Sequence, residues 1–132
     1  MGHSSGGVAS MAAGYHRPEA FGCVVSHCAS YVNIRGGHQL PWAVRNTPRK
    51  GIRVLLLIGS NDNDNDHGNN RLGNEQLDSA LQYAGYDSAL VIGTGYHNRV
   101  TTQRFLPRLG FQEIPEIDLS FVGAGPRGAC VS

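Results

Sequence analysis

The chain has 132 residues, which is enough for one domain with a modest hydrophobic core, and its apolar content of 40% is that of an ordinary globular protein. The formal net charge is +1 with histidine neutral, and no cluster of Lys and Arg forms a basic stripe, so we expect no nucleic-acid partner. No apolar run approaches the roughly 20 residues that span a bilayer, so we expect no membrane partner either.

The first part of the chain predicts a helix and then a buried strand. Over residues 5–15, apolar side chains recur at positions i, i+3, i+4 and i+7, which is the spacing of one buried helix face: Val8, Met11, Ala12 and Tyr15. Pro18 ends this helix, and the short apolar run at residues 21–26 indicates a buried strand. Residues 30–50 are rich in Gly and Pro and predict a long connection, with a short helix near Trp42.

The middle of the chain predicts two more strands and a helix between them. Residues 52–58 are almost continuously apolar, as in a parallel strand that is covered on both faces. A polar loop over residues 59–70 follows. The spacing then predicts a helix over residues 74–84, with Gly85 as its C-cap, and a short third strand over residues 89–92.

The alternation of helices and strands predicts an α/β fold, with about three parallel strands and flanking helices. Residues 99–109 fit a last helix. After Gly110 the alternation breaks down, so we expect one domain over residues 1–109 and an irregular tail over residues 110–132.

Residues 2–6, Gly-His-Ser-Ser-Gly, match the G-x-S-x-G pattern of a nucleophile elbow. In such a turn from strand to helix, side chains at the two glycine positions would clash with neighbouring backbone. The turn would lift the Ser4 hydroxyl to the carboxyl edge of the sheet, and the N–H of Ser5 would be an oxyanion donor. A flexible Gly/Ser-rich terminus is the alternative, but the adjoining apolar helix stripe argues against it.

Asp62 directly follows the strongest predicted strand, where a carboxylate can orient a catalytic imidazole. Asn and Asp are also common in solvated turns, and for Asp64 and Asp66 we prefer that interpretation. The loop also suggests calcium, but an EF-hand needs Gly and Glu where His67 and Gly73 stand. We therefore predict no metal in this loop.

His97 ends a Gly-rich turn, residues 93–97, after the last predicted strand. Ser4, Asp62 and His97 thus occur in the order Ser…Asp…His of the α/β-hydrolases, and each lies at or beyond the carboxyl end of a strand. His3 is the variable residue of the elbow. The other histidines fit surface or partly buried positions and lack metal-ligand spacing: His16, His27, His38 and His67.

Several further segments match one known family. On these segments, residues 2–109 of the chain resemble the esterase family that includes esterase D, feruloyl esterases and enterochelin-esterase-like proteins. The matching segments are Gly-His-Ser-Ser-Gly-Gly (2–7), Arg-Pro-Glu-Ala-Phe (17–21), Asn-Ile-Arg-Gly-Gly-His (33–38), Gly-Ser-Asn-Asp (59–62), Ala-Gly-Tyr-Asp (84–87) and Gly-Tyr-His-Asn (95–98).

The resemblance implies a partial α/β-hydrolase fold and a catalytic triad of Ser4 as nucleophile, Asp62 as acid and His97 as general base. A small carboxylic ester would form an acyl-enzyme that water releases, without a cofactor. The resemblance also suggests substrate contacts for three residues in the long connection, although the arginine could instead pair with a surface acid. These three are Asn33, Arg35 and His38.

The chain departs from the family at both ends. Family members carry several strands before the elbow, whereas Met1 stands where the elbow strand should be, and residues 110–132 do not resemble the usual final helix. Loss of one oxyanion donor typically lowers the rate by about 10²–10³-fold, so we expect little or no activity from the chain alone. The competing hypothesis is a non-catalytic α/β fragment that pairs its exposed strand edge with a partner or with itself.

Overall fold

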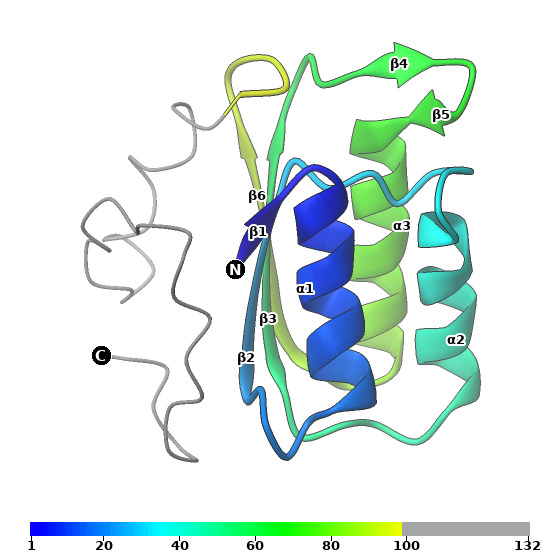
Figure 1. Cartoon of the computed structure of the whole chain (residues 1–132), viewed down its shortest axis with the longest axis vertical. Helices are drawn as coiled ribbons and strands as arrows, with labels where there is room; N and C mark the ends of the chain where they lie inside the picture. The colour runs from blue at the N-terminus through cyan, green and yellow to red at the C-terminus, as the bar shows by residue number, and fades with distance from the viewer. Residues whose placement is uncertain (99–132) are drawn as a thin grey trace.

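A parallel sheet of four strands forms the centre of the computed structural model, which describes residues 1–98 (Figure 1). The strands lie in the order β1-β2-β3-β6, so the predicted α/β fold is confirmed. Their bounds are β1 Gly2–His3, β2 Cys23–His27, β3 Arg53–Gly59 and β6 Asp87–Gly93. The expected helix at residues 99–109 and the tail at 110–132 lie outside the described residues.

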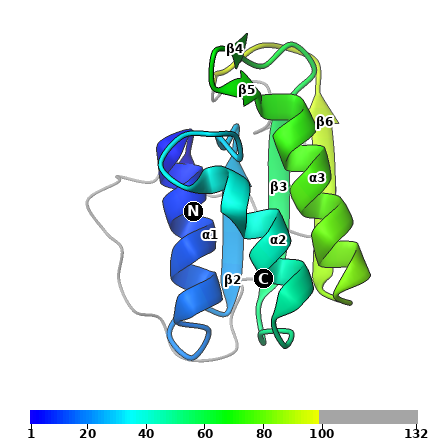
Figure 2. The same cartoon turned by 90° about the vertical axis from the view of Figure 1, so that its right-hand side faces the viewer.

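The described helices all lie on one face of the sheet (Figure 1). Their bounds are α1 Ser5–His16, α2 Leu40–Asn46 and α3 Asn70–Tyr83, with a short 3-10 helix at Gly37–Gln39 before α2. Helices α1 and α3 contact the sheet, and α2 packs beside α3 (Figure 2). Within residues 1–98, no helix has the length and the apolar character needed to cross a bilayer.

The strand β1 is an edge strand of two residues, and it was missing from the predicted sheet. Gly2 pairs with Ser26 of β2, and His3 pairs with His27. The two residues before Ser4 therefore supply a short strand to enter the turn, where the sequence suggested that such a strand was lost.

The stripe of α1 that faces the core differs from the predicted one. Val8, Met11, Ala12 and Tyr15 were expected to share the buried face, whereas the buried residues are Gly7, Met11, Gly14 and Tyr15. A β-carbon on Gly14 would lie 2.4 Å from Cγ2 of Val24. The two glycines thus let the helix approach the sheet more closely than any side chain would permit.

The helix α3 begins four residues earlier than its apolar pattern predicts. The side chain of Asn69 caps it by accepting a hydrogen bond from the backbone N–H of Leu72. Inside the first turns, the buried amide of Asn74 donates to the backbone carbonyl of Ala29 at 2.7 Å. Polar side chains thus extend the helix toward the sheet edge, and Gly85, with φ +73°, follows its end as predicted.

Before α3, the polar loop contains a small antiparallel hairpin that the sequence did not suggest. Its strands are β4 Asp64–Asn65 and β5 Gly68–Asn69. The hairpin belongs to the loop that follows the carboxyl end of β3, and it lies above the start of α3 at the upper end of the molecule (Figure 1).

Candidate functional site

Ser4 lies in a strained turn between β1 and α1. Its backbone has φ 57° and ψ −125°, a conformation that costs non-glycine residues of order 1–3 kcal/mol. The turn is held because the N–H of Ser4 donates to the carbonyl of His27 at 2.9 Å, and the carbonyl of Ser4 accepts from Gly7 at 2.9 Å. The serine is thus fixed at the amino end of a helix.

The glycines of the elbow are not equivalent. A β-carbon on Gly2 would lie 2.0 Å from the backbone oxygen of Gly6, so Gly2 is sterically required, as predicted. A β-carbon on Gly6 would meet nothing within 4 Å, so the same expectation for Gly6 was wrong. The close approach falls instead on Gly7, where a β-carbon would lie 2.7 Å from that of Ala29.

This asymmetry gives a matched pair of variants. Gly2→Ala should lower the free energy of unfolding by about 1–3 kcal/mol, because the new methyl group overlaps backbone that must move. If the chain hydrolyses esters, the displaced elbow should also lower the rate by about 100-fold. Gly6→Ala should change neither quantity appreciably. Urea unfolding and an ester assay check both variants, and equal effects of the two substitutions would contradict this account of the turn.

Asp62 and His97 meet above the carboxyl ends of β3 and β6. Nδ1 of His97 lies 2.8 Å from Oδ1 of Asp62, so the ring nitrogen donates to the carboxylate. The two loops are joined by backbone hydrogen bonds from Ser60 to Gly93 at 2.8 Å and from Asn61 to Gly95 at 2.9 Å. The pairing of acid and imidazole therefore follows from the parallel register of the two strands.

Gly59, the last residue of β3, permits this close approach. A β-carbon there would lie 2.6 Å from the carbonyl oxygen of Gly95 and 2.8 Å from that of Tyr96. Any side chain at position 59 would consequently push the loop that carries His97 away from Asp62.

The carboxylate of Asp62 is buried and held in one orientation. Oδ1 also accepts a hydrogen bond from the Asn70 side chain at 3.0 Å and from the backbone N–H of Asn63 at 2.7 Å. Burial raises the pKa of Asp62, but the hydrogen bonds from Asn70, Cys28, His97 and Asn63 together lower it more, so the net pKa lies below its ordinary value. The side chain is thus ionised at neutral pH and able to stabilise a protonated imidazole.

The structure brings His97 next to the elbow without bonding it to the serine. The ring centroids of His97 and His3 lie 4.8 Å apart, and His3 directly precedes Ser4. Among the described residues, Ser4 and His97 share no hydrogen bond. Such bonds are often long in unliganded enzymes and shorten when substrate binds.

Of the residues expected to donate to the oxyanion or to contact substrate, two lie beside one hollow and two do not. Ser5 is the first residue of α1, where a backbone N–H has no partner within the helix. Arg35 lines a hollow beside Ser5, formed with apolar side chains of α1, and joins none of the ion pairs within residues 1–98. Asn33 and His38 are exposed and do not line this hollow.

Cys28 and Asn70 contribute to the site and were not identified from the sequence. Burial first, and then the carboxylate of Asp62, raise the pKa of the Cys28 thiol to about 12. The thiol is therefore protonated at neutral pH, which disfavours it as a nucleophile. Its position directly after β2 is a signal that could have drawn attention to it, whereas no sequence pattern marks Asn70.

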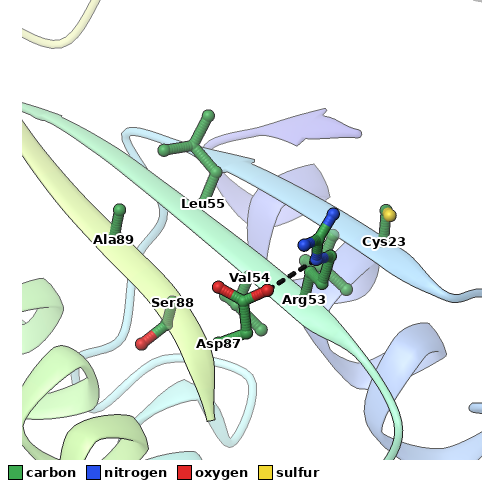
Figure 3. A pocket seen from close by; sticks show the side chains of 8 residues that line it. Cys23, Arg53, Val54, Leu55, Asp87, Ser88 and Ala89 are labelled. Carbon is green, nitrogen blue, oxygen red and sulfur yellow. Dashed lines mark hydrogen bonds and ion pairs between the residues drawn. The ribbon is translucent and has the colours of Figure 1, made fainter. Parts of the chain in front are cut away.

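A second hollow lies at the opposite end of the strands. It is lined by residues from the amino ends of β2, β3 and β6, and an exposed ion pair between Arg53 and Asp87 crosses it (Figure 3). Ser4, Asp62 and His97 all lie near or beyond the carboxyl ends of their strands. This second hollow is thus remote from the candidate site.

Comparison with known proteins relates part of the chain to an esterase. The chain is 54% identical over 64 residues to the iron(III) enterobactin esterase of Escherichia coli O6:H1 (strain CFT073), a match that covers 44% of this chain. The chain covers 16% of the length of that relative. No protein-family model and no solved structure matches the chain. An esterase-like relation is therefore established for part of the chain.

Proposed function

We propose that the chain carries the catalytic groups of a serine esterase. The observation that supports this most is the hydrogen bond between His97 and the buried, ionised Asp62. The ring of His97 also contacts His3, the residue before a serine in a strained turn between strand and helix. A solvated surface turn would have no reason to bury a carboxylate against an imidazole. The partial relation to an esterase agrees with this assignment.

In the proposed reaction, Nε2 of His97 accepts the proton of the Ser4 hydroxyl while Oγ attacks the ester carbonyl. Asp62 holds the Nδ1–H of the ring and stabilises its positive charge. The N–H of Ser5 donates to the oxyanion, and the positive end of α1 favours the same negative charge. His97 then protonates the departing alcohol, and water releases the acid from the acyl-enzyme by the reverse sequence of proton transfers.

The proposed substrate is a small carboxylic ester. The hollow beside Ser5 is mainly apolar and Arg35 also lines it, so it suits an acyl group with a negatively charged or polar end. Because the E. coli relative is named for iron(III) enterobactin, that compound is the first substrate to test. Asn33 and His38 remain proposed substrate contacts on the same connection.

A fluorophosphonate probe tests the nucleophile directly. Oγ of an activated serine attacks phosphorus and displaces fluoride, which leaves a stable phosphonyl ester on the protein. We expect one label per chain, located on Ser4 by peptide mass spectrometry, and no labelling of protein that is heat-denatured before the probe is added. Ser5→Ala should still be labelled, since only its backbone is used. Labelling at other serines, or equal labelling of denatured protein, would contradict the proposal.

The non-catalytic alternative rests on the edge of the sheet. Within the described residues, β1 pairs with Ser26 and His27 of β2, so the outer edge of β2 at Val24 and Val25 has no strand beside it. Such an edge can pair with another chain. A folded chain that forms concentration-dependent dimers by light scattering and resists the fluorophosphonate would favour this alternative.

A further inference from the structure

Three side chains from distant parts of the chain bring metal-binding atoms together beside the elbow. His3 lies in β1, Cys28 directly follows β2, and His97 lies in the loop after β6. One donor atom from each residue lies within 4.8 Å of the other two. Cys28 is 25 positions after His3 and 69 positions before His97, so no short motif reveals this cluster.

We propose that His3, Cys28 and His97 form a binding site for a thiophilic divalent metal ion, of which zinc fits best. Two imidazoles and one thiolate are ligands that Zn²⁺ prefers, and three protein ligands leave a fourth position open to water. Since the Cys28 thiol is protonated in the free chain, binding of the ion would release its proton to solvent. Among the described residues, the carboxylate hydrogen-bonded to this cluster is that of Asp62, and its Oδ1 already accepts three hydrogen bonds. The ligand set therefore disfavours calcium and magnesium.

The spacing of the donors is close to that of a zinc centre. Zinc–nitrogen and zinc–sulfur distances of about 2.0 and 2.3 Å place tetrahedral donors roughly 3.3–3.6 Å apart. The observed limit of 4.8 Å requires shifts of about 1 Å, which rotation of side chains can supply. The two histidines are partly exposed, so an ion can reach the cluster, whereas Cys28 is buried beneath them.

The hydrogen bond from His97 to Asp62 orients His97 as a metal ligand. Metal-binding histidines commonly donate their second ring N–H to a carboxylate, which fixes the tautomer and increases the basicity of the other nitrogen. His97 makes this bond from Nδ1 to Asp62 and so directs its lone pair to Nε2. The same contact that orients a general base thus also orients a metal ligand.

Occupation of this site would compete with ester hydrolysis. This consequence rests on the proposed function, because there Nε2 of His97 must accept the proton of Ser4. An ion bound to that nitrogen removes the base, and removal of the ion restores it. Metal binding itself does not depend on whether the chain is an esterase.

The test begins with binding to the full chain in a non-chelating buffer. Zn²⁺ should bind with a stoichiometry of one by calorimetry. Co²⁺ should give visible absorption of a tetrahedral centre together with a thiolate-to-cobalt charge-transfer band in the near ultraviolet. Absence of the charge-transfer band, with binding of Zn²⁺ no tighter than to the variant Cys28→Ser, would overturn the proposal.

Variants distinguish this site from other thiols and histidines. Loss of an outer partner of a metal site costs about 10–100-fold in affinity, so loss of a ligand in Cys28→Ser or His3→Gln should weaken Zn²⁺ binding at least that much. His16→Gln removes an exposed histidine from the far end of α1 and should bind as the natural chain does. Circular dichroism checks that each variant is folded. An equal loss in His16→Gln would place the ion elsewhere and refute the proposal.

The inhibition is measured separately. If the chain hydrolyses esters, stoichiometric Zn²⁺ should abolish the activity and a chelator should restore it. Activity that persists with the site filled, as judged by calorimetry, would refute competition for His97. Absence of any ester hydrolysis would contradict the proposed function and leave the binding result to decide the metal site.

Discussion

Replacing Ser4 with alanine is expected to reduce ester hydrolysis to the rate of buffer alone. In serine hydrolases, loss of the nucleophile costs up to about 10⁶-fold in kcat, because the imidazole and acid have no function without it. Because the rate of ester hydrolysis by this chain is expected to be low, such a loss removes all measurable activity. The substitution should leave the stability of the fold unchanged, because the side chain of Ser4 makes no capping hydrogen bond to α1.

The control for this experiment is the neighbouring serine. Ser5→Ala keeps the backbone N–H that would bind the oxyanion and should retain activity within a few-fold. The assay uses a chromogenic short-chain ester and iron(III) enterobactin in parallel, with freshly refolded and heat-denatured protein as references. Equal rates for the natural chain and Ser4→Ala would reject catalysis through this residue, whatever the substrate.

Replacing Asp62 with asparagine is expected to lower ester hydrolysis by about 10⁴-fold. Asparagine has nearly the same shape, but its amide cannot hold the Nδ1–H tautomer of His97 as a carboxylate does or stabilise the charged ring. It also leaves the donors of Asn70 and Asn63 facing a neutral partner. Asp64→Asn, an exposed carboxylate of the same loop, should have no such effect.

The same variant should alter stability in acid. The pKa of Asp62 is lowered from 3.8 in the folded chain, so the ionised group contributes stability above that value, and the contribution is lost as pH falls through the lower folded pKa. The free energy of unfolding of the natural chain should therefore decrease below pH 3.8 more steeply than that of Asp62→Asn. Parallel curves in urea titrations between about pH 2 and 6 would contradict the assigned hydrogen bonds.

Local patterns were sufficient to predict most of the sheet and its helices. The apolar runs that became β2, β3 and β6 were identified, as were α1, α2 and α3, because burial on a sheet requires continuous or periodic apolar residues. Boundaries were less accurate where polar groups decide them, as at Asn69 and Asn74 of α3. The cap that starts this helix, from Asn69 to Leu72, is a local signal that was missed, whereas the partner of Asn74 is Ala29, far away in the sequence.

Chain order and strand pattern are local properties, so they were sufficient to predict the order Ser4, Asp62, His97 and the positions of Asp62 and His97 after a strand. The strand β1 before Ser4 was found only in the structure. Only the tertiary structure decided that Gly7 rather than Gly6 makes the close approach at the elbow, and that His97 bonds Asp62 across the loop above Gly59. The structure alone also gathered His3, Cys28 and His97. These features arise because parallel strands bring their carboxyl ends to one edge of the sheet. Residues far apart in the sequence meet there, and no sequence spacing predicts which of them will be in contact.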